Sequence, residues 1–283
     1  GNATLFVHTQ KVSDEVKSHL GDDVTIRPEN DIEEYLQQLG RSGKCVLIDP
    51  KLTPVHYGQL LEDHGAQILK GDDPAALPRA IKNETEQQGA RDAQIRDGAA
   101  MVRFLHWLSR NAPSGTVTEI SAAQKLESFR RETEALQDVS FATISGSAAH
   151  GAIVHYRVTT ETDRQLQPGE LYLVDSGGQY KDGTTDITRV VAVREPSPEM
   201  RENYTSVLQG HINLTLARFP KGTTGHQLDS LARFPLWQRG LDYDHGTGHG
   251  VGSYLGVHEG PQNISKRMIS QPLEPGMICS NEP

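Results

Sequence analysis

Short apolar runs alternate with stretches of helical apolar spacing over the first 78 residues. Strands are expected at 24–26, 44–50 and 66–70, and helices at 30–40 and 54–64. Asn30 or Asp31 is suited to cap the first of these helices, and Gly40 is suited to end it. An alternation of this kind predicts a small α/β layer with parallel strands.

A turn-rich stretch at 71–78 ends this layer, and we expect a domain boundary there. The next stretch, 84–111, has the longest helical pattern in the chain. One face of this helix is expected to be apolar and formed by Ile95, Ala99, Val102, Leu105, Trp107 and Leu108. A second helix is expected at about 118–132, with Thr118 as its N-cap and Glu119 in its first turn.

Strand-like runs then come together and are followed by helices. The strands are expected at 139–144, 152–158, 170–176 and 186–193, the helices at 198–218 and 224–239, and a last apolar run at 277–280. Because strands are grouped with strands and helices with helices, the order predicts an α+β domain with a curved antiparallel sheet.

The composition excludes several classes of protein. The 283 residues have a formal net charge of −9, so no basic footprint favours a nucleic acid or an anionic membrane as partner. No stretch approaches the roughly 18–20 consecutive apolar residues of a membrane span. Two distant cysteines, Cys45 and Cys279, and the lack of a signal peptide favour a reducing, cytoplasmic location. Because the chain starts at Gly1 and stops at Pro283 directly after an apolar run, we expect a fragment of a longer protein.

Two aspartates flank a glycine-rich turn between strands. Asp175 follows the apolar run 171–174, and Asp186 opens the next strand eleven residues later. A hairpin would bring the two carboxylates together, where their repulsion requires a cation, and a pair of divalent metal ions would meet that need. The alternative is that both are ordinary turn-forming aspartates.

A glycine-rich stretch of 14 residues, 245–258, contains three histidines, His245, His249 and His258. Five glycines between positions 246 and 256 exclude a regular helix, so the imidazoles are displayed on tightly turning backbone. Imidazole binds transition metals and titrates near neutral pH, which suits either ligation or proton transfer. The alternative is a histidine-rich surface loop.

Two further residues are candidates for chemistry. Glu282 follows an apolar run at 277–280, and Pro283 fixes the chain direction after it. Taken alone, a carboxylate such as Glu282 in this position is most often a solvent-exposed strand end. His155 lies in an apolar run that we expect to be a buried strand, where a hydrogen-bonded core histidine is the alternative to a catalytic one.

Taken in order, these stretches resemble the dinuclear metallopeptidases with the pita-bread fold, which include methionine aminopeptidase, prolidase, aminopeptidase P and creatinase. The motifs are Val-His-Tyr at 154–156, Val-Asp-Ser-Gly-Gly at 174–178, His-Gly-Thr-Gly-His-Gly-Val-Gly at 245–252, Val-His-Glu-Gly-Pro at 257–261 and Asn-Glu-Pro at 281–283. Within the family, the chain is most similar to aminopeptidase P of the long, cytosolic type. The segments that carry this similarity are 95–98, 102–105 and 245–261. The segment 48–57 resembles the domain that precedes the catalytic one in that type.

The resemblance implies a metal site and its ligands. Asp175, Asp186, His249 and Glu282 would bind two divalent ions. The resemblance favours Mn²⁺, although the mixed carboxylate and imidazole set also suits Zn²⁺ or Co²⁺. The family's fifth ligand is a second, bridging Glu shortly beyond the last residue of this chain. We therefore expect the metal site of this fragment to be incomplete or empty, with at most one ion and little activity.

The resemblance also implies a fold and roles for three histidines. Residues 1–78 would be the C-terminal part of a non-catalytic α/β domain of the creatinase N-terminal type, and 79–283 a pita-bread metallopeptidase domain truncated before its last strands. His155 and His258 would contact the scissile region and assist proton movement, while His245 would line the proline pocket.

The expected activity is hydrolysis of the bond between an N-terminal residue and a following proline. Peptides with proline at position 2 would be the substrates, and a homodimer is the expected assembly. One alternative is a prolidase-like dipeptidase or another pita-bread metalloenzyme. A second alternative is a pita-bread domain retained as a non-catalytic interaction module, which the four candidate ligands count against.

Overall fold

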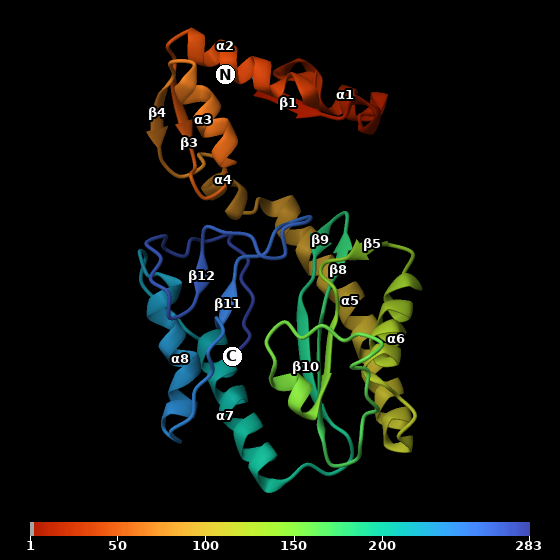
Figure 1. Cartoon of the computed structure of the whole chain (residues 1–283). Helices are drawn as coiled ribbons and strands as arrows, with labels where there is room; N and C mark the ends of the chain where they lie inside the picture. Colours follow the sequence, from red (N-terminus) through yellow and green to blue (C-terminus); the bar gives the residue numbers. More distant parts are fainter. Residues whose placement is uncertain (1–2) are drawn as a thin grey trace. The chain divides into compact units, whose positions relative to one another are not determined.

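The computed structural model describes residues 3–283 and divides the chain into two compact units. The first unit ends at Ala75, and the second runs from Ala76 to Pro283. Figure 1 shows the helices and strands of each unit. Among the described residues, no helix is long and apolar enough to cross a bilayer.

The first unit contains two pairs of parallel strands with helices between them. The strands are β1 (Ala3–Val7) paired with β2 (Val24–Pro28), and β3 (Cys45–Ile48) paired with β4 (Gln67–Lys70). The helices are α1 (Asp14–Leu20), α2 (Ile32–Arg41) and α3 (Val55–Asp63), with short 3-10 helices at Thr9–Lys11, Gly21–Asp23 and Glu29–Asp31. The parallel α/β layer expected from the sequence is therefore confirmed, although its strands form two small sheets rather than one.

Gly40 does not end α2, contrary to the expectation. The helix continues to Arg41, and Gly40 is buried inside it. A Cβ at this position would lie 2.6 Å from the Cβ of His64 and 3.0 Å from the carbonyl oxygen of Leu61. The glycine is needed because the end of α3 packs directly against the backbone of α2.

The second unit begins with α4 (Ala76–Ala80) and the long α5 (Glu84–Asn111). The bounds of α5 agree with the sequence pattern because Asn83 and Glu86 form a capping box at its start. The expected apolar face is confirmed at Leu108, with Leu105 and Trp107 packed against the core, but it is wrong at Ile95 and Val102, which are 73% and 66% exposed. The buried face consists of Ala93, Asp97, Ala100, Met101, Phe104 and Leu108. Apolar spacing missed this face because it contains small residues and a charged one.

The buried charge on α5 is explained by α6 (Glu119–Arg131). Asp97 accepts hydrogen bonds from Nε and Nη2 of Arg130 at 2.7 and 3.0 Å, and both side chains are fully buried. The hydroxyl of Tyr180 donates a third hydrogen bond to Asp97 at 2.6 Å. A charged residue on the buried face is tolerated here because its partners are buried with it. The N-cap of α6 is Thr118, as expected.

Antiparallel strands pack against these two helices. One sheet has the order β10–β7–β6 and the other the order β5–β8–β9. Their bounds are Leu136–Val139 for β5, Ile144–Ser147 for β6, Leu171–Ser176 for β7, Gly178–Tyr180 for β8, Gly183–Thr184 for β9 and Ile187–Ala192 for β10. The main core lies between the β10–β7–β6 sheet and the helices α5 and α6. Tyr172 and Val174 of β7 belong to the same buried cluster as Phe104 and Leu126. The antiparallel sheet of the α+β domain is thus confirmed.

Two expected strands differ in the structure. Residues 140–143 connect β5 to β6 instead of continuing a strand. The run 152–158 is not a strand, because the 3-10 helix Ala148–Ala152 is followed by a turn in which His155 has a φ of 57°. Ile153 and Val154 are exposed, and Tyr156 is the buried residue of the turn. The apolar run therefore faces solvent instead of joining the sheet.

The remaining part of the second unit has a small core of its own. The elements are α7 (Pro198–Thr215), α8 (Gly225–Trp237), β11 (Gly248–His249) and β12 (Asn263–Ile264). Leu214, Leu228, Ala232 and Ile264 form its buried cluster. Figure 1 shows α7 and α8 on the other side of the unit from α5 and α6, with β11 and β12 on the same side as α7 and α8. The apolar run 277–280 pairs through isolated bridges instead of a regular strand.

Candidate metal centre

Asp175 and Asp186 come from neighbouring strands. Asp175 is the fifth residue of β7, on the opposite face from the buried Tyr172 and Val174, since side chains alternate along a strand. Asp186 directly precedes β10, whose register pairs Ile187 with Ser176. The expected hairpin is present, with β8 and β9 forming its bent outer end. It brings both carboxylates to the same end of the neighbouring strands β7 and β10.

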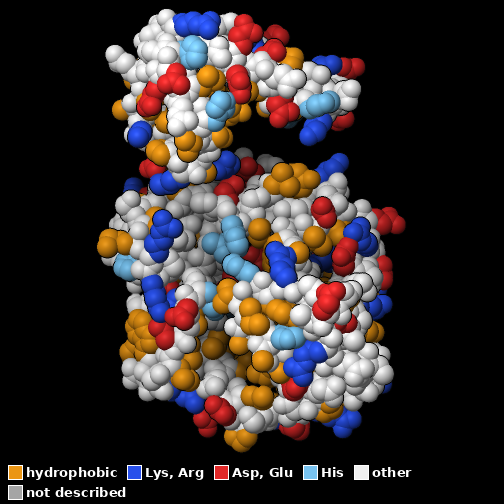
Figure 2. Space-filling model, in the orientation of Figure 1, with side chains coloured by type: hydrophobic (Ala, Val, Ile, Leu, Met, Phe, Trp, Pro, Cys, Tyr) orange, Lys and Arg blue, Asp and Glu red, His pale blue; other side chains and the backbone are white. Residues whose placement is uncertain are grey.

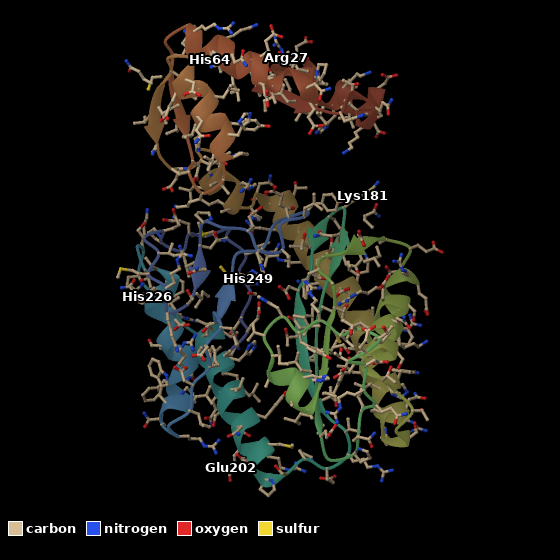
Figure 3. The ribbon with its side chains drawn as sticks, viewed as in Figure 1. Arg27, His64, Lys181, Glu202, His226 and His249 are labelled. Carbon is tan, nitrogen blue, oxygen red and sulfur yellow. The ribbon has the colours of Figure 1, made fainter. Side chains whose placement is uncertain are left out.

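His249 and Glu282 come from two extended segments that pair with each other. The amide of Ser280 donates to the carbonyl oxygen of His249 at 2.9 Å, and the amide of Glu282 donates to that of Thr247 at 2.7 Å. A Cβ on Gly248 would lie 2.2 Å from the carbonyl oxygen of Ser280, so only glycine allows this approach. The pairing carries Glu282 toward the aspartates. His249 is labelled in Figure 3, near the centre of the second unit.

Three side chains converge on one point. Nε2 of His249 lies 3.2 Å from Oδ2 of Asp186 and 3.1 Å from Oε1 of Glu282. One ligand atom from each of the three lies within 4.8 Å of the other two. These three residues are the one cluster of this kind within residues 3–283. Asp175 lies beside it, close enough for the charges of Asp186 and Glu282 to act on its carboxyl group.

The site concentrates negative charge in a partly buried space, which shifts proton affinities. Burial, and then the nearby charge of Asp186, raises the pKa of Asp175 to about 7. Burial would lower the pKa of His249, but contacts with the carboxylates of Asp186 and Glu282 outweigh it and raise the pKa to about 10. Burial acts to raise the pKa of Glu282, yet His249 and Ser280 hold it below the usual value. The cluster therefore attracts positive charge.

A divalent ion fits this donor set. Asp175 Oδ1, His249 Nε2 and Glu282 Oε1 are buried without a partner in hydrogen-bonding geometry, although the last two are only 3.1 Å apart. Nδ1–H of His249 donates a hydrogen bond to the carbonyl oxygen of Gly250 at 2.9 Å, which leaves Nε2 as the atom available to a metal ion. Orphaned oxygen and nitrogen atoms that face one space are the arrangement that a metal ion would satisfy.

The other candidate histidines lie around this cluster. The rings of His249 and His258 are 4.3 Å apart in an edge-to-face arrangement, and His155 lies 6.2 Å from His258. Both His155 and His258 are exposed, so the expected buried position of His155 is wrong. Burial and then the charge of His249 lower the pKa of His258, which favours its neutral form at neutral pH. Figure 2 shows histidine side chains gathered at the centre of one face of the second unit.

His245 is held differently from the other two. Its ring stacks on Tyr243 with centroids 4.6 Å apart, and its Nδ1 lies 2.8 Å from the carbonyl oxygen of Gly246. Its charge also contributes to the lowered pKa of Glu282, so the side chain lies near the cluster. The structure thus brings all seven candidate residues to one region.

The sequence did not reveal the buried ions that hold the site. Arg233 of α8 is fully buried and donates to Asp229 at 2.7 Å and to the carbonyl oxygen of His245 at 2.8 Å. Asp229 accepts a further hydrogen bond from the hydroxyl of Thr247 at 2.5 Å. The spacing of Asp229 and Arg233 by four positions indicates an ion pair on a helix. It does not indicate that this pair supports the loop before His249.

A second buried carboxylate supports the segment that contains His155. Glu119 accepts hydrogen bonds from the amide of Ser147 at 2.7 Å and from Nδ1 of His150 at 2.9 Å. The hydroxyl of Tyr156, next to His155, donates to it at 3.3 Å. Glu119 was expected in the first turn of a helix, and its role in fixing this turn follows only from the structure.

Comparison with known proteins agrees with this arrangement. Residues 88–283 match the model of metallopeptidase family M24, and residues 1–86 match the creatinase/prolidase N-terminal domain. Xaa-Pro aminopeptidase 1 of Dictyostelium discoideum is 44% identical over 286 residues, which cover 99% of this chain and 45% of that protein. The chain spans about half the length of the curated relatives that it matches.

Two solved structures share the fold. The X-prolyl aminopeptidase of Caenorhabditis elegans, described as a cytosolic enzyme with a di-nuclear active site, matches with a TM-score of 0.90 and 34% identity, over 99% of this chain and 46% of that one. The Xaa-Pro dipeptidase of Bacillus anthracis matches with a TM-score of 0.80 and 25% identity, over 98% of this chain and 76% of that one.

Proposed function

Because the chain belongs to metallopeptidase family M24, with the pita-bread fold and a creatinase-like N-terminal domain, we propose that it functions as an Xaa-Pro aminopeptidase. The reaction would remove the N-terminal residue from peptides whose second residue is proline. The observation that supports this most directly is the convergence of Asp186, His249 and Glu282 beside Asp175, with donor atoms that lack partners. Residues 79–283 would form the catalytic domain and residues 1–78 a non-catalytic one.

The four side chains would hold two divalent ions, and we propose Mn²⁺, with Zn²⁺ or Co²⁺ as alternatives. Ions bound there would supply Lewis acidity, which polarises a carbonyl group and acidifies water. The protein's part is to hold the carboxylates together despite their repulsion, which the β7–β10 pairing does for Asp175 and Asp186. The bond from His249 Nδ1 to the carbonyl oxygen of Gly250 keeps Nε2 directed at the same space.

The histidines around the ligands would act on the substrate. His258 lies against His249 and has a lowered pKa, so it is neutral at neutral pH and able to accept or donate a proton. His155 is displayed on a left-handed turn near His258 and would contact the scissile region with it. His245, stacked on Tyr243, would line the pocket for the proline ring. An Xaa-Pro bond has no N–H, so such a site must recognise the ring and the carbonyl group instead.

The cellular location and assembly are also proposals. A cytoplasmic location is supported by the description of the C. elegans enzyme as cytosolic. A homodimer stays a prediction.

The test is peptide hydrolysis by the full-length natural protein that contains this chain. We expect release of the N-terminal residue from Xaa-Pro-Yaa peptides, slow cleavage of Gly-Pro, and no cleavage of Xaa-Ala-Yaa. Preference for Gly-Pro would instead indicate a prolidase-like dipeptidase, which the match to the B. anthracis enzyme makes the second candidate. Absence of both activities and of bound metal would favour a non-catalytic interaction module.

A further inference from the structure

Lys82 is a buried lysine outside the residues that the proposed reaction uses. It is 2% exposed, and a lysine is seldom buried to this degree unless its charge is paired. Its Nζ donates to Oε1 of Glu259 at 2.5 Å and to the carbonyl oxygen of Arg79 at 3.0 Å. Nε of Arg79 lies 3.3 Å from Oε2 of the same glutamate. One carboxylate is therefore held by two cations, one of them fully buried.

Glu259 directly follows His258 and is fixed at its backbone as well. Its amide donates to the carbonyl oxygen of Gly250 at 2.8 Å. The same carbonyl oxygen accepts the hydrogen bond from Nδ1 of His249. The backbone of Glu259 therefore joins the segment of His258 to Gly250, which follows His249. Lys82 fixes the side chain of Glu259.

The backbone of Lys82 is bound to a different segment, the one that precedes Glu282. Its amide donates to the carbonyl oxygen of Gly276 at 3.0 Å, and Ile81 forms a bridge with Met277. Its carbonyl oxygen accepts from Nε2 of Gln87 at 2.8 Å. Lys82 therefore joins the loop that contains His258 to the segment that leads to Glu282.

A second buried ion pair in this unit allows a comparison. Arg130 and Asp97 are equally buried, but the further partner of Asp97 is Tyr180 of β8. Within residues 3–283, neither Arg130 nor Asp97 forms a hydrogen bond with the loop that contains His258. Both pairs bury charge. The Lys82–Glu259 pair differs because Glu259 is the neighbour in sequence of a candidate catalytic residue, His258.

We propose that Lys82 is a positioning residue, which acts through Glu259 to hold His258 beside His249. The proposal rests on the proposed function, because it assigns His258 a role in that reaction. Displacement of His258 should slow the chemical step without removing metal or weakening peptide binding, since the hydrogen bonds of Lys82 go to Arg79, Glu259, Gln87 and Gly276 and not to a candidate ligand.

The kinetic test uses the full-length protein with Lys82→Met, alone and combined with His258→Ala. We expect Lys82→Met to lower kcat by about 10²-fold, as for a misplaced catalytic group, with unchanged KM and metal content. In the His258→Ala protein the same substitution should change kcat little. Equal losses in both backgrounds, or loss of metal, would show that Lys82 does not act through His258.

A second variant covers the case in which Lys82→Met does not fold. Lys82→Met with Glu259→Gln removes both charges and leaves no unpaired buried ion. We expect it to fold and still to have the lowered kcat. A kcat equal to that of the unmodified protein would overturn the proposal. Arg130→Met serves as the matched control, with lower stability but an unchanged kcat for the folded fraction.

Amide hydrogen exchange separates this proposal from the proposed function. Lys82→Met should speed exchange in peptides covering 250–262 relative to those covering 171–176, while Arg130→Met should not produce this difference. If the unmodified protein hydrolyses no peptide, the proposed function fails, and the exchange measurement still decides whether Lys82 holds this loop. Unchanged relative exchange at 250–262 would overturn the role of Lys82.

Discussion

Asp175 and Asp186 lie on or beside regular strands of the β10–β7–β6 sheet, whereas His249 and Glu282 lie on segments with very short or isolated strand pairing. We call the first region, with α5 and α6, the sheet half of the second unit. The second region, with α7, α8, β11, β12 and 277–282, is the loop half. Each half contributes two of the four candidate ligands.

The two halves are stabilised in different ways. The sheet half has a continuous apolar core in which β7 packs on α5 and α6. The loop half has a smaller buried apolar cluster, and its turns are held by Arg233, Asp229 and the Lys82–Glu259 pair. Irregular segments leave many backbone groups without ladder partners, so buried side chains must bind them instead. Buried charge occurs in both halves, but in the loop half Arg233 binds the backbone that leads to His249, whereas the Asp97–Arg130 pair of the sheet half joins two helices.

The largest effect is expected where the halves meet, at the ligands. Asp186→Asn should remove metal and lower activity by about 10⁴-fold or more, because the ions supply several kcal/mol of transition-state stabilisation. Asp182→Asn is the matched control on the same hairpin, since Asp182 pairs with Arg96 at the surface. Metal content and kcat/KM of the full-length protein measure the effect. Full metal content in Asp186→Asn would contradict the ligand assignment.

The next effect separates proton transfer from ligation within the loop half. His258→Ala should lower kcat by about 10²- to 10⁴-fold, as for a lost acid–base group, and leave metal content unchanged. His106→Ala, at an exposed position of α5, should change neither quantity. Loss of metal with His258→Ala would place His258 among the ligands.

Removing a buried ion of the loop half tests the comparison directly. Arg233→Met leaves Asp229 buried without its partner and should lower the free energy of unfolding by about 3–5 kcal/mol. Arg239→Met, just after the same helix, removes a surface pair with Glu202 and should cost about 1 kcal/mol or less. Urea denaturation measures both. Similar losses for the two variants would mean that the buried network does not hold the loop half.

The ion-free protein should lose stability as the pH rises. The pKa of Asp175 is raised from 3.8 to about 7, so the stability from its protonated form is present below pH 4 and lost up to pH 7. The pKa of His249 is raised from 6.5 to about 10, so its contribution is lost between pH 6.5 and 10. Both changes have the same sign, and we expect a loss on the order of 5 kcal/mol from pH 5 to pH 9.

Urea denaturation in the presence of a chelator checks this pH dependence. Asp175→Asn should remove the lower part of the slope, and Mn²⁺ should restore stability most at high pH because protons compete with the metal for the ligands. Stability that rises with pH in the ion-free protein would contradict the predicted protonation of the cluster.

The smallest expected effect is the loss of stability on removal of a helix N-cap, and it should be equal in the two halves. Asn83 caps α5 of the sheet half, and Ser197 caps α7 of the loop half by accepting the amide hydrogen of Met200. Asn83→Ala and Ser197→Ala should each lower the free energy of unfolding by about 1 kcal/mol. A much larger loss for Ser197→Ala would show that helix starts also support the loop half.

The sequence by itself determined the local elements and the family. The bounds of α5, the cap of α6 and the strands around Asp175 follow from apolar period and capping residues, which act over a few positions. The motifs around the candidate ligands identify metallopeptidase family M24, and this identification is confirmed. The hairpin joining Asp175 and Asp186 was predictable because its strands are neighbours in sequence.

Tertiary structure decided what depends on distant partners. The buried face of α5 contains Asp97 because Arg130 of another helix neutralises it, and no period within α5 records that partner. The run 152–158 is a surface turn because Glu119 holds Tyr156 and His150 from another element. Glu282 comes close to His249 because the backbones of two segments distant in sequence pair with each other. Lys82 binds Glu259, which lies 177 positions later in the chain. Such contacts depend on the packing of the whole unit, which local apolar and polar patterns do not specify.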